Sequence, residues 1–303
     1  MTDSVSRSEE HAAPPVVAAV DGSPSSNRAV AWAAVEANIH GCGLHLLNSW
    51  ILPVGFGPEA TMTEHDLRAL HDEAGRLLAG AEHIARTAAP DPGLVITTEA
   101  LDKLVVPALV ERSDSARMLV VGSRGLGAFQ RGLIGSVSTA VTQHARCPVA
   151  VIHADAPLDV AAATRPVLVG VDGSGNSVPA VELAFDEAAR RRVGLVAVHA
   201  WSDTSGYEIP LRHWDGARES AKALLAENLA GYAEKYPDVP VERRVTADRP
   251  VRSLLDASTD AQLVVVGSHG RGGFASMLLG STSSALLHAV DTPIVIVRAR
   301  ERR

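Results

Sequence analysis

Short apolar runs alternate along the chain with longer segments in which apolar residues recur every three or four positions. The short runs predict buried strands, because a parallel strand covered on both faces is apolar almost throughout. The expected strands are residues 16–20, 44–49, 94–99, 118–122, 148–153, 167–171, 195–200, 239–245, 263–267 and 293–297. The amphipathic segments predict helices at residues 25–39, 63–89, 105–113, 136–146, 178–192, 218–236, 250–258 and 281–290. Strands that alternate with helices are expected to pair in parallel, in a doubly wound α/β sheet.

The order of the elements repeats, and a glycine-rich stretch repeats with it. Gly122-Ser123-Arg124-Gly125 precedes Gly135-Ser136 by nine residues, and Gly267-Ser268-His269-Gly270 precedes Gly280-Ser281 by the same nine. Residues 118–139 and 263–284 agree at 11 of 22 positions. One domain has therefore been duplicated. The expected layout is a disordered leader at 1–15, domains at 16–154 and 166–299, and a linker at 155–165.

A glycine loop between a strand and a helix is typical of an anion site. Glycines let a ligand approach the backbone, and the free N–H groups at the start of the helix suit phosphate oxygens. Ser136, Ser138, Ser281 and Ser283 add hydroxyl donors there. The alternative is a pair of structural turns with serine N-caps. Two copies with equal spacing favour the phosphate interpretation.

The ends of neighbouring strands indicate where a ligand would bind. Asp21 ends the first strand and Gly122 ends the strand expected beside it; Asp172 and Gly267 repeat this relation. Ligands of open parallel sheets bind at the carboxyl ends of the strands. Each aspartate is therefore expected to face the same crevice as a glycine loop, although an Asp-Gly-Ser sequence is also an ordinary turn or N-cap, with the aspartate as the cap.

Composition narrows the class of protein. A chain of 303 residues can form two domains of about 150 residues each. A net charge of −7 with no basic face argues against nucleic-acid binding. Two cysteines at non-equivalent places predict no disulfide framework and a cytoplasmic location, and no apolar run is long enough to span a membrane. There is no P-loop motif, no cluster of zinc ligands and no repeated Ser, His and Asp set, so no catalytic residue is proposed.

The motif Gly-x-x-Gly-x9-Gly-Ser, after a first strand that ends in Asp, resembles the ATP-binding universal stress protein family. The resemblance covers residues 16–297 as a tandem of two such domains. It implies a Rossmann-like fold of the adenine nucleotide alpha hydrolase type, with five parallel strands and helices on both faces in each domain. It also implies bound ATP with little or no turnover.

The resemblance assigns roles to positions of this sequence. Asp21 and Asp172 would contact adenine or the sugar, with Gly22 and Gly173 beside them in the same sites. Ser49, Ala200, Val121 and Val266 would flank adenine, although Ser49 departs from the small apolar residue usual in the family. Ribose and phosphates would be held by Gly122, Gly125, Gly135, Ser136 and Val137 in the first half, and by Gly267, Gly270, Gly280, Ser281 and Thr282 in the second.

These assignments lead to three hypotheses. The first is a stress-adaptation protein that binds one ATP per domain, with Mg²⁺, and acts through conformation or a regulatory protein partner. The second is a slow ATPase or phosphotransferase that uses the same sites, and the third is an interaction protein whose loops are only structural. The last strands of the halves, residues 148–153 and 293–297, are candidate edges for pairing the halves or for a homodimer.

Overall fold

The computed structural model describes residues 13–50, 63–125, 135–201, 214–271 and 278–299. Among these residues, all ten expected strands are present, and they form one sheet in the order β3-β2-β1-β4-β5-β10-β9-β6-β7-β8. In the first half the strands are β1 (Val16–Ala19), β2 (Leu44–Trp50), β3 (Ile96–Asp102), β4 (Met118–Gly122) and β5 (Val149–Ile152). In the second half they are β6 (Val167–Gly170), β7 (Leu195–Ala200), β8 (Val241–Thr246), β9 (Leu263–Gly267) and β10 (Ile294–Val297). Pairing within each half is parallel, as predicted.

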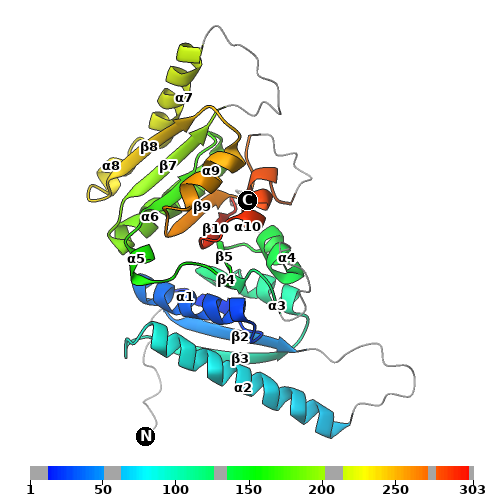
Figure 1. The fold of residues 1–303 in the computed structure, drawn as a ribbon. Coiled ribbons are helices and arrows are strands. Elements are labelled where there is room, and N and C mark those ends of the chain that lie inside the picture. The colour runs from blue at the N-terminus through cyan, green and yellow to red at the C-terminus, as the bar shows by residue number, and fades with distance from the viewer. Residues whose placement is uncertain (1–12, 51–62, 126–134, 202–213, 272–277, 300–303) are drawn as a thin grey trace, which may run out of the picture.

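The two halves join through their last strands (Figure 1). β10 pairs with β5 in the antiparallel sense, with Ile294 opposite Val151 and Ile296 opposite Val149. Both strands also have a parallel neighbour, β4 or β9, on their other side. The prediction that these strands pair the halves is therefore confirmed. A homodimer through the same edges is ruled out, because neither strand is an edge of the sheet.

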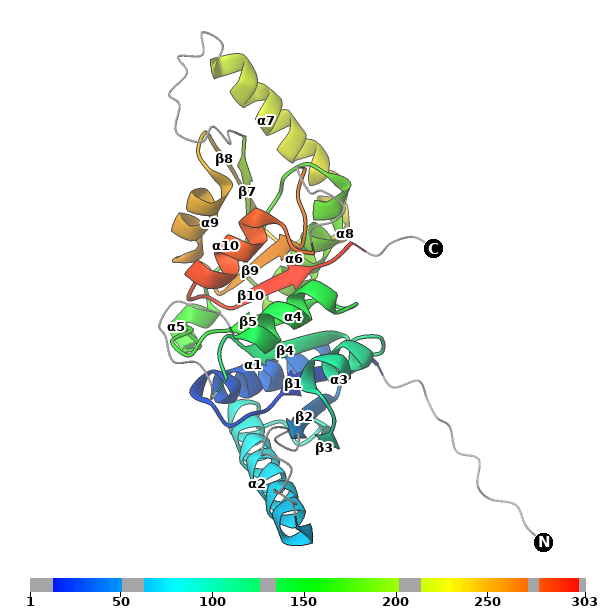
Figure 2. The same cartoon turned by 90° about the vertical axis from the view of Figure 1, so that its right-hand side faces the viewer.

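Helices cover both faces of the sheet, and each face has its own apolar core. One face is covered by α1 (Pro24–His40), α2 (Glu64–Ala88), α6 (Val178–Arg191) and α7 (Trp214–Asn228). The other is covered by α3 (Val105–Arg112), α4 (Ser136–His144), α9 (Pro250–Ser258) and α10 (Ser281–Ala289), which face the viewer in Figure 2. The largest fully buried side chains, such as Phe185 and Leu44, come from both halves.

Most predicted boundaries hold within a few residues, and the exceptions have local causes. The single helix expected at 218–236 is two helices, α7 and α8 (Tyr232–Lys235), because Gly231 adopts a left-handed conformation with φ 82° and interrupts the helix. The expected linker contains a short helix, α5 (Val160–Ala163), whose N-cap is Asp159. β3 lies further along the chain than expected, because its seven residues follow the full length of β2.

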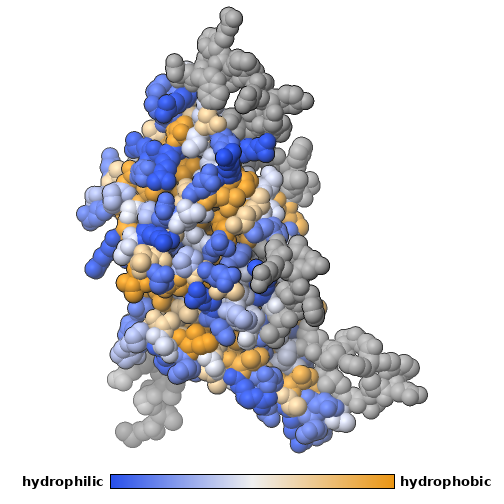
Figure 3. Space-filling model, in the orientation of Figure 1, coloured by the Kyte–Doolittle hydropathy of each residue, from blue (hydrophilic) through white to orange (hydrophobic). Residues whose placement is uncertain are grey.

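Residues 13–15, the described part of the expected leader, lie against the first half. Most of the expected leader lies outside the described residues, but the carbonyl of Pro15 accepts a hydrogen bond of 2.9 Å from the amide of Arg117. Hydrophilic side chains cover much of the face seen in Figure 3, with apolar residues in small separate areas. Among the described residues, no helix combines the length and the apolar character that a membrane span requires.

Candidate functional site

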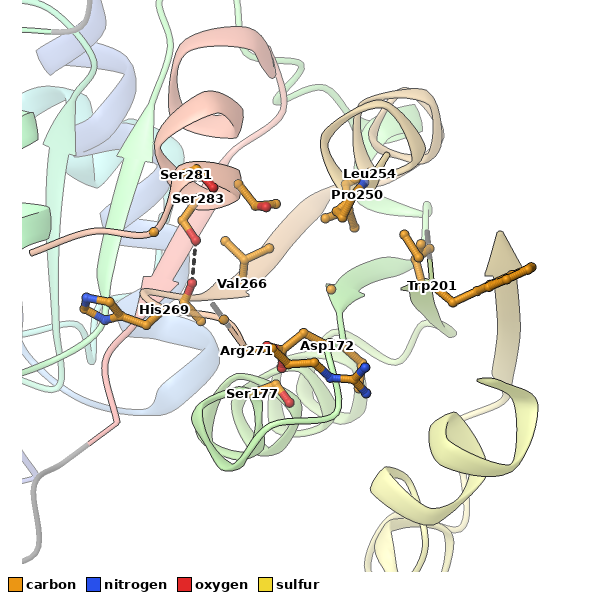
Figure 4. A pocket seen from close by; sticks show the side chains of 18 residues that line it. Asp172, Ser177, Trp201, Pro250, Leu254, Val266, His269, Arg271, Ser281 and Ser283 are labelled. Atoms are coloured by element: carbon orange, nitrogen blue, oxygen red, sulfur yellow. Dashed lines mark hydrogen bonds between the residues drawn. The ribbon is translucent and has the colours of Figure 1, made fainter. Parts of the chain in front are cut away.

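A cavity of about 450 Å³ opens at the carboxyl ends of β6, β7 and β9, beside the first turns of α9 and α10 (Figure 4). Its lining divides into an apolar part and a polar part. The apolar part is formed by Val171, Val198, Ala200, Pro250, Leu254 and Val266. The polar part is formed by Asp172, Ser177, His269, Arg271, Ser281, Thr282 and Ser283, together with the loop glycines. The arrangement suits a ligand with one flat apolar end and one anionic end.

The cavity brings together most of the site residues predicted in the second half. Asp172, Ala200, Val266, Gly267, Gly270, Gly280, Ser281 and Thr282 all line it. Gly173 does not line it but forms the turn that follows Asp172, with φ 79°. That these residues contact a nucleotide remains a prediction, whereas their convergence on one cavity is observed.

The aspartate at the end of the first strand of each half makes the same turn. Asp21 Oδ1 accepts a hydrogen bond from the amide of Ser23, and Asp172 Oδ1 accepts one from the amide of Ser174, both at 2.9 Å. The intervening glycines, Gly22 and Gly173, both have φ 79°, where a side chain would be strained. The alternative in which Asp21 caps the following helix is wrong, because Ser23 is the N-cap residue of α1.

The glycine loops close onto the ends of β4 and β9 with matching hydrogen bonds. The amide of Gly135 donates to the carbonyl of Ser123, and the amide of Gly280 donates to the carbonyl of Ser268, both at 2.7 Å. Each of these glycines is the N-cap residue of the next helix. Among the described residues, neither α4 nor α10 receives a side-chain cap. The serine N-caps expected in the structural alternative are therefore absent from these two helices, which are capped by Gly135 and Gly280.

The other serines of the first turn point back at the loop instead of capping it. Ser138 Oγ donates to the carbonyls of Ser123 and Gly135 at 3.1 and 2.9 Å, and Ser283 Oγ donates to the carbonyl of Gly267 at 2.6 Å. Their hydroxyls hold the loop against the helix, and the first turn of α10, which has no side-chain cap, lines the cavity. Uncapped N–H groups and the positive end of a helix dipole together attract an anion.

Two glycines of each loop lie so close to their neighbours that a side chain would displace them. A Cβ on Gly122 would lie 2.8 Å from backbone atoms of α1, and one on Gly267 would lie 3.0 Å from the carbonyl oxygen of Asn176. A Cβ on Gly125 would lie 2.5 Å from Asp21 Oδ2, and one on Gly270 would lie 3.0 Å from Asp172 Oδ2. The second glycine of each loop therefore leaves room for the carboxylate of Asp21 or Asp172.

The first half repeats this framework with its own differences. Asp21, Gly22, Gly122, Gly125, Gly135, Ser136 and Val137 occupy the positions of their counterparts, while residues 126–134 lie outside the described part of the loop. Val121 is buried at the end of β4. Ser49 uses its hydroxyl to donate to the carbonyl of Lys103, so this side chain is tied to the segment after β3. Ser23 Oγ donates to the carbonyl of Arg124 at 3.1 Å, and Ser25 Oγ donates to the same atom.

Ten of the residues that line the cavity were not among the predicted site residues, and three of them have large aromatic or basic side chains. Trp201 follows β7, and its recurrence at the position of Trp50 was a usable signal in the sequence. His269 lies inside the glycine loop, where only the glycines were predicted to bind. Arg271 lies beside Asp172 in Figure 4, and its Nη2 would be 2.5 Å from a Cβ on Gly173. The sequence suggested that Arg271 could neutralise phosphate, but an arginine in an exposed loop is more often solvated, so Arg271 was not predicted as a site residue.

A buried side chain from the neighbouring strand fixes the backbone directly before each aspartate. His199 Nδ1 donates to the carbonyl of Val171, and Asn48 Nδ2 donates to the carbonyl of Val20, both at 2.6 Å. Both side chains are buried at the ends of β7 and β2. Each bond holds the residue directly before the aspartate.

Comparisons with known proteins agree with this architecture. The model of the universal stress protein family matches residues 14–153 and 163–298. Universal stress protein Rv2005c of Mycobacterium tuberculosis is 45% identical over 284 residues, which cover 93% of this chain and 96% of the relative. A universal stress protein of Mycolicibacterium smegmatis is 42% identical over 288 residues, with 94% and 97% covered. The crystal structure of a universal stress protein from Archaeoglobus fulgidus is similar in fold, with a TM-score of 0.69 at 19% identity, covering 94% of this chain and 98% of that chain.

Proposed function

This chain belongs to the universal stress protein family, as a tandem of two domains, and from that premise we propose that it binds one ATP in each half. The observation that carries the proposal is the uncapped start of α10 facing a cavity whose opposite side is apolar. Adenine would occupy the apolar part, between Val198, Leu254 and Val266. The phosphates would reach the first turn of α10, where Ser281 and Thr282 lie.

Asp172 and Arg271 give the cavity its charged groups. Asp172 Oδ1 is engaged by Ser174, whose hydroxyl lies 3.0 Å from Oδ2. A carboxylate held in this way, between the two ends of the cavity, suits the hydroxyl groups of ribose. Arg271 supplies a positive charge beside it that offsets part of the charge of the bound anion.

Magnesium would accompany the triphosphate. Among the described residues that line the cavity, Asp172 is the only carboxylate, so the protein offers Mg²⁺ few ligands of its own. Phosphate oxygens and water would complete its shell, as is usual for this ion. We therefore expect Mg²⁺ to raise ATP affinity only modestly.

We propose a regulatory protein that acts by binding and not by turnover. His269 Nδ1 lies 3.0 Å from the hydroxyl of Ser268, but Ser268 is buried and is not among the residues that line the cavity, so this pair does not present a nucleophile to a bound phosphate. A ligand then acts by favouring one conformation, or one partner, by its differential affinity. A cytoplasmic location, a homodimer formed by other surfaces and a regulatory partner remain predictions.

Isothermal titration with ATP, ADP and GTP tests the proposal. We expect two ATP molecules per chain and weaker binding of GTP, because guanine has more polar groups than adenine to place against the apolar part of the cavity. If the protein does not bind ATP at millimolar concentration, the glycine loops are only structural turns. Steady phosphate release that persists after repurification would instead support the ATPase alternative.

A further inference from the structure

Two helices meet across the joint between the halves, far from both glycine loops. Glu36 and His40 lie in the last turns of α1, and Glu187 and Arg191 lie in the last turns of α6. The two pairs are related by the duplication, since Glu36 matches Glu187 and His40 matches Arg191 at the same offset of 151. The side chains of Glu36, His40 and Glu187 are 0% exposed, and that of Arg191 is 9% exposed. We call these four residues the joint quartet.

Both cations of the joint quartet bridge both carboxylates. His40 Nε2 lies 3.0 Å from Glu36 Oε1 and 2.9 Å from Glu187 Oε1. Arg191 Nε lies 3.1 Å from Glu187 Oε2, and its Nη2 contacts Glu36 Oε2. Each carboxylate therefore meets one cation from its own helix and one from the other half. The quartet ties α1 to α6 directly.

No neighbouring group takes the place of His40 as the cation between the two glutamates. Asp186 Oδ2 is 3.9 Å from His40 Nδ1, too far for a hydrogen bond, and is itself paired with Arg117 and Arg190. Arg191 also donates to Gln262 at 3.2 Å and lies over the ring of Trp32. The charged and titratable groups that face the quartet are Asp186, Arg190, Arg117 and Cys42. No second cation among the described residues reaches the two Oε1 atoms that His40 bridges.

The net charge of the joint quartet depends on the proton of His40. With His40 protonated and both glutamates ionised, the quartet holds two positive and two negative groups. Without that proton, two buried carboxylates share one guanidinium, and a buried charge left without a partner is strongly unfavourable. The duplication put a permanent cation at one of two equivalent places and a titratable one at the other.

We propose that His40 makes the joint between the halves sensitive to protons: its protonated ring closes the joint quartet, and its deprotonation weakens the contact between α1 and α6. The joined halves share one sheet, so the effect is a loss of stability at the joint and not a separation of the domains.

The pKa values of His40 and Glu36 are both raised, which is the direction that a proton-sensitive joint requires. Burial acts to lower the pKa of His40, but its hydrogen bonds to Glu187 and Glu36 raise it from 6.5 to about 9. A raised histidine pKa stabilises the fold fully below pH 6.5, and this stabilisation is lost as the pH rises through 9. Burial and the neighbouring Glu187 carboxylate raise the pKa of Glu36 from 4.5 to about 7, which adds a loss between those values. Both groups therefore make the joint weaker as the pH rises.

Thermal unfolding of the full chain at pH 6.5 and pH 9.5 tests the proposal. We expect the Tm of the wild type to fall by roughly 5 °C more than that of His40→Arg, which keeps a permanent cation as at position 191. His40→Gln should start lower at pH 6.5 and lose little more. His144→Arg, at an exposed position in the last turn of α4, is the control and should keep the wild-type fall.

Two outcomes would overturn the proposal. One is the same fall in Tm for the wild type, His40→Arg and His40→Gln, which would mean that the proton on His40 does not matter. The other concerns a metal ion, since ligand atoms of Glu36, His40 and Glu187 lie within 4.8 Å of one another. If ZnCl₂ at pH 7.5 raised the Tm of the wild type but not of His40→Gln, the cluster would be a metal centre and not a proton-sensitive joint.

Discussion

Asn48 and His199 stand at equivalent positions of the two halves, and each donates a hydrogen bond of 2.6 Å to the carbonyl of a valine, Val20 or Val171. The next residue in each case is the aspartate of the site. The two side chains differ in size and chemistry but deliver one N–H donor to the same place. The conserved feature of the duplicated site is therefore the donor and not the residue type.

Replacing His199 tests what this donor does. His199→Asn should bind ATP in the second half within about twofold of the wild type, because asparagine makes the same bond at position 48. His199→Leu leaves the carbonyl of Val171 buried without its donor and should weaken that site by about tenfold or more. Isothermal titration resolves the two sites, and the first site is the internal control. Equal affinity in both variants would show that the bond does not position Asp172.

Alanine at the second loop glycine should displace the carboxylate. A methyl group on Gly125 would lie 2.5 Å from Asp21 Oδ2, and one on Gly270 would lie 3.0 Å from Asp172 Oδ2. Gly125→Ala should therefore weaken the first site about tenfold, and Gly270→Ala should weaken the second site less. Gly75→Ala, in α2 with no atom within 4 Å of the new methyl, is the matched control for the change itself. An unchanged affinity in Gly125→Ala would contradict a role for Asp21 in binding.

Acid should destabilise the fold through His153, which directly follows strand β5 at the joint between the halves. Its Nε2 is buried without a hydrogen-bond partner among the described residues, and burial lowers the pKa of His153 below 6.5. A lowered histidine pKa gives stability that is present above pH 6.5 and is lost as the pH falls below it, because the unfolded chain binds the proton more tightly. His153→Gln should show a smaller fall in Tm from pH 7.5 to pH 5.5 than the wild type. His144→Gln, at an exposed site, should show the wild-type fall, and parallel curves for all three proteins would exclude the effect.

Much of the fold followed from periodicity. The apolar runs placed all ten strands, and the expectation that Asp172 and Gly267 face one crevice held because β6 and β9 are parallel neighbours. The capping-box helix α2 begins at Glu64, next to Thr63, where its start was predicted. Local patterns of this kind depend on short stretches of chain, which is why sequence was sufficient.

Other features depend on contacts between distant residues and could not be predicted. Gly231 lies inside an amphipathic run, and only the left-handed conformation it adopts shows that the helix ends there. The sequence left open whether the last strands join the halves or two chains, because both use the same apolar edge. Arg271 lies at the site because the fold brings its side chain next to Gly173. Glu36 and Glu187 meet only because the joint brings α1 onto α6.

Proline can remove one of the free N–H groups at the start of α4 or α10 without harm to the helix. Gly135 and Gly280 have φ and ψ near −66° and 152°, the extended conformation that suits a residue before proline. Ser136 and Ser281 are exposed first residues of their helices, where proline is favoured. Ser136→Pro and Ser281→Pro therefore delete a donor, and Ser136→Ala and Ser281→Ala delete only the hydroxyl.

The most direct measurement is to release nucleotide from purified protein with acid, then identify it and count it per chain in the wild type and in these four variants. We expect two ATP per chain in the wild type and about one in each proline variant. The alanine variants should stay near two. Wild-type protein that is empty and ignores added ATP, or proline variants that keep both nucleotides, would contradict binding at the helix starts.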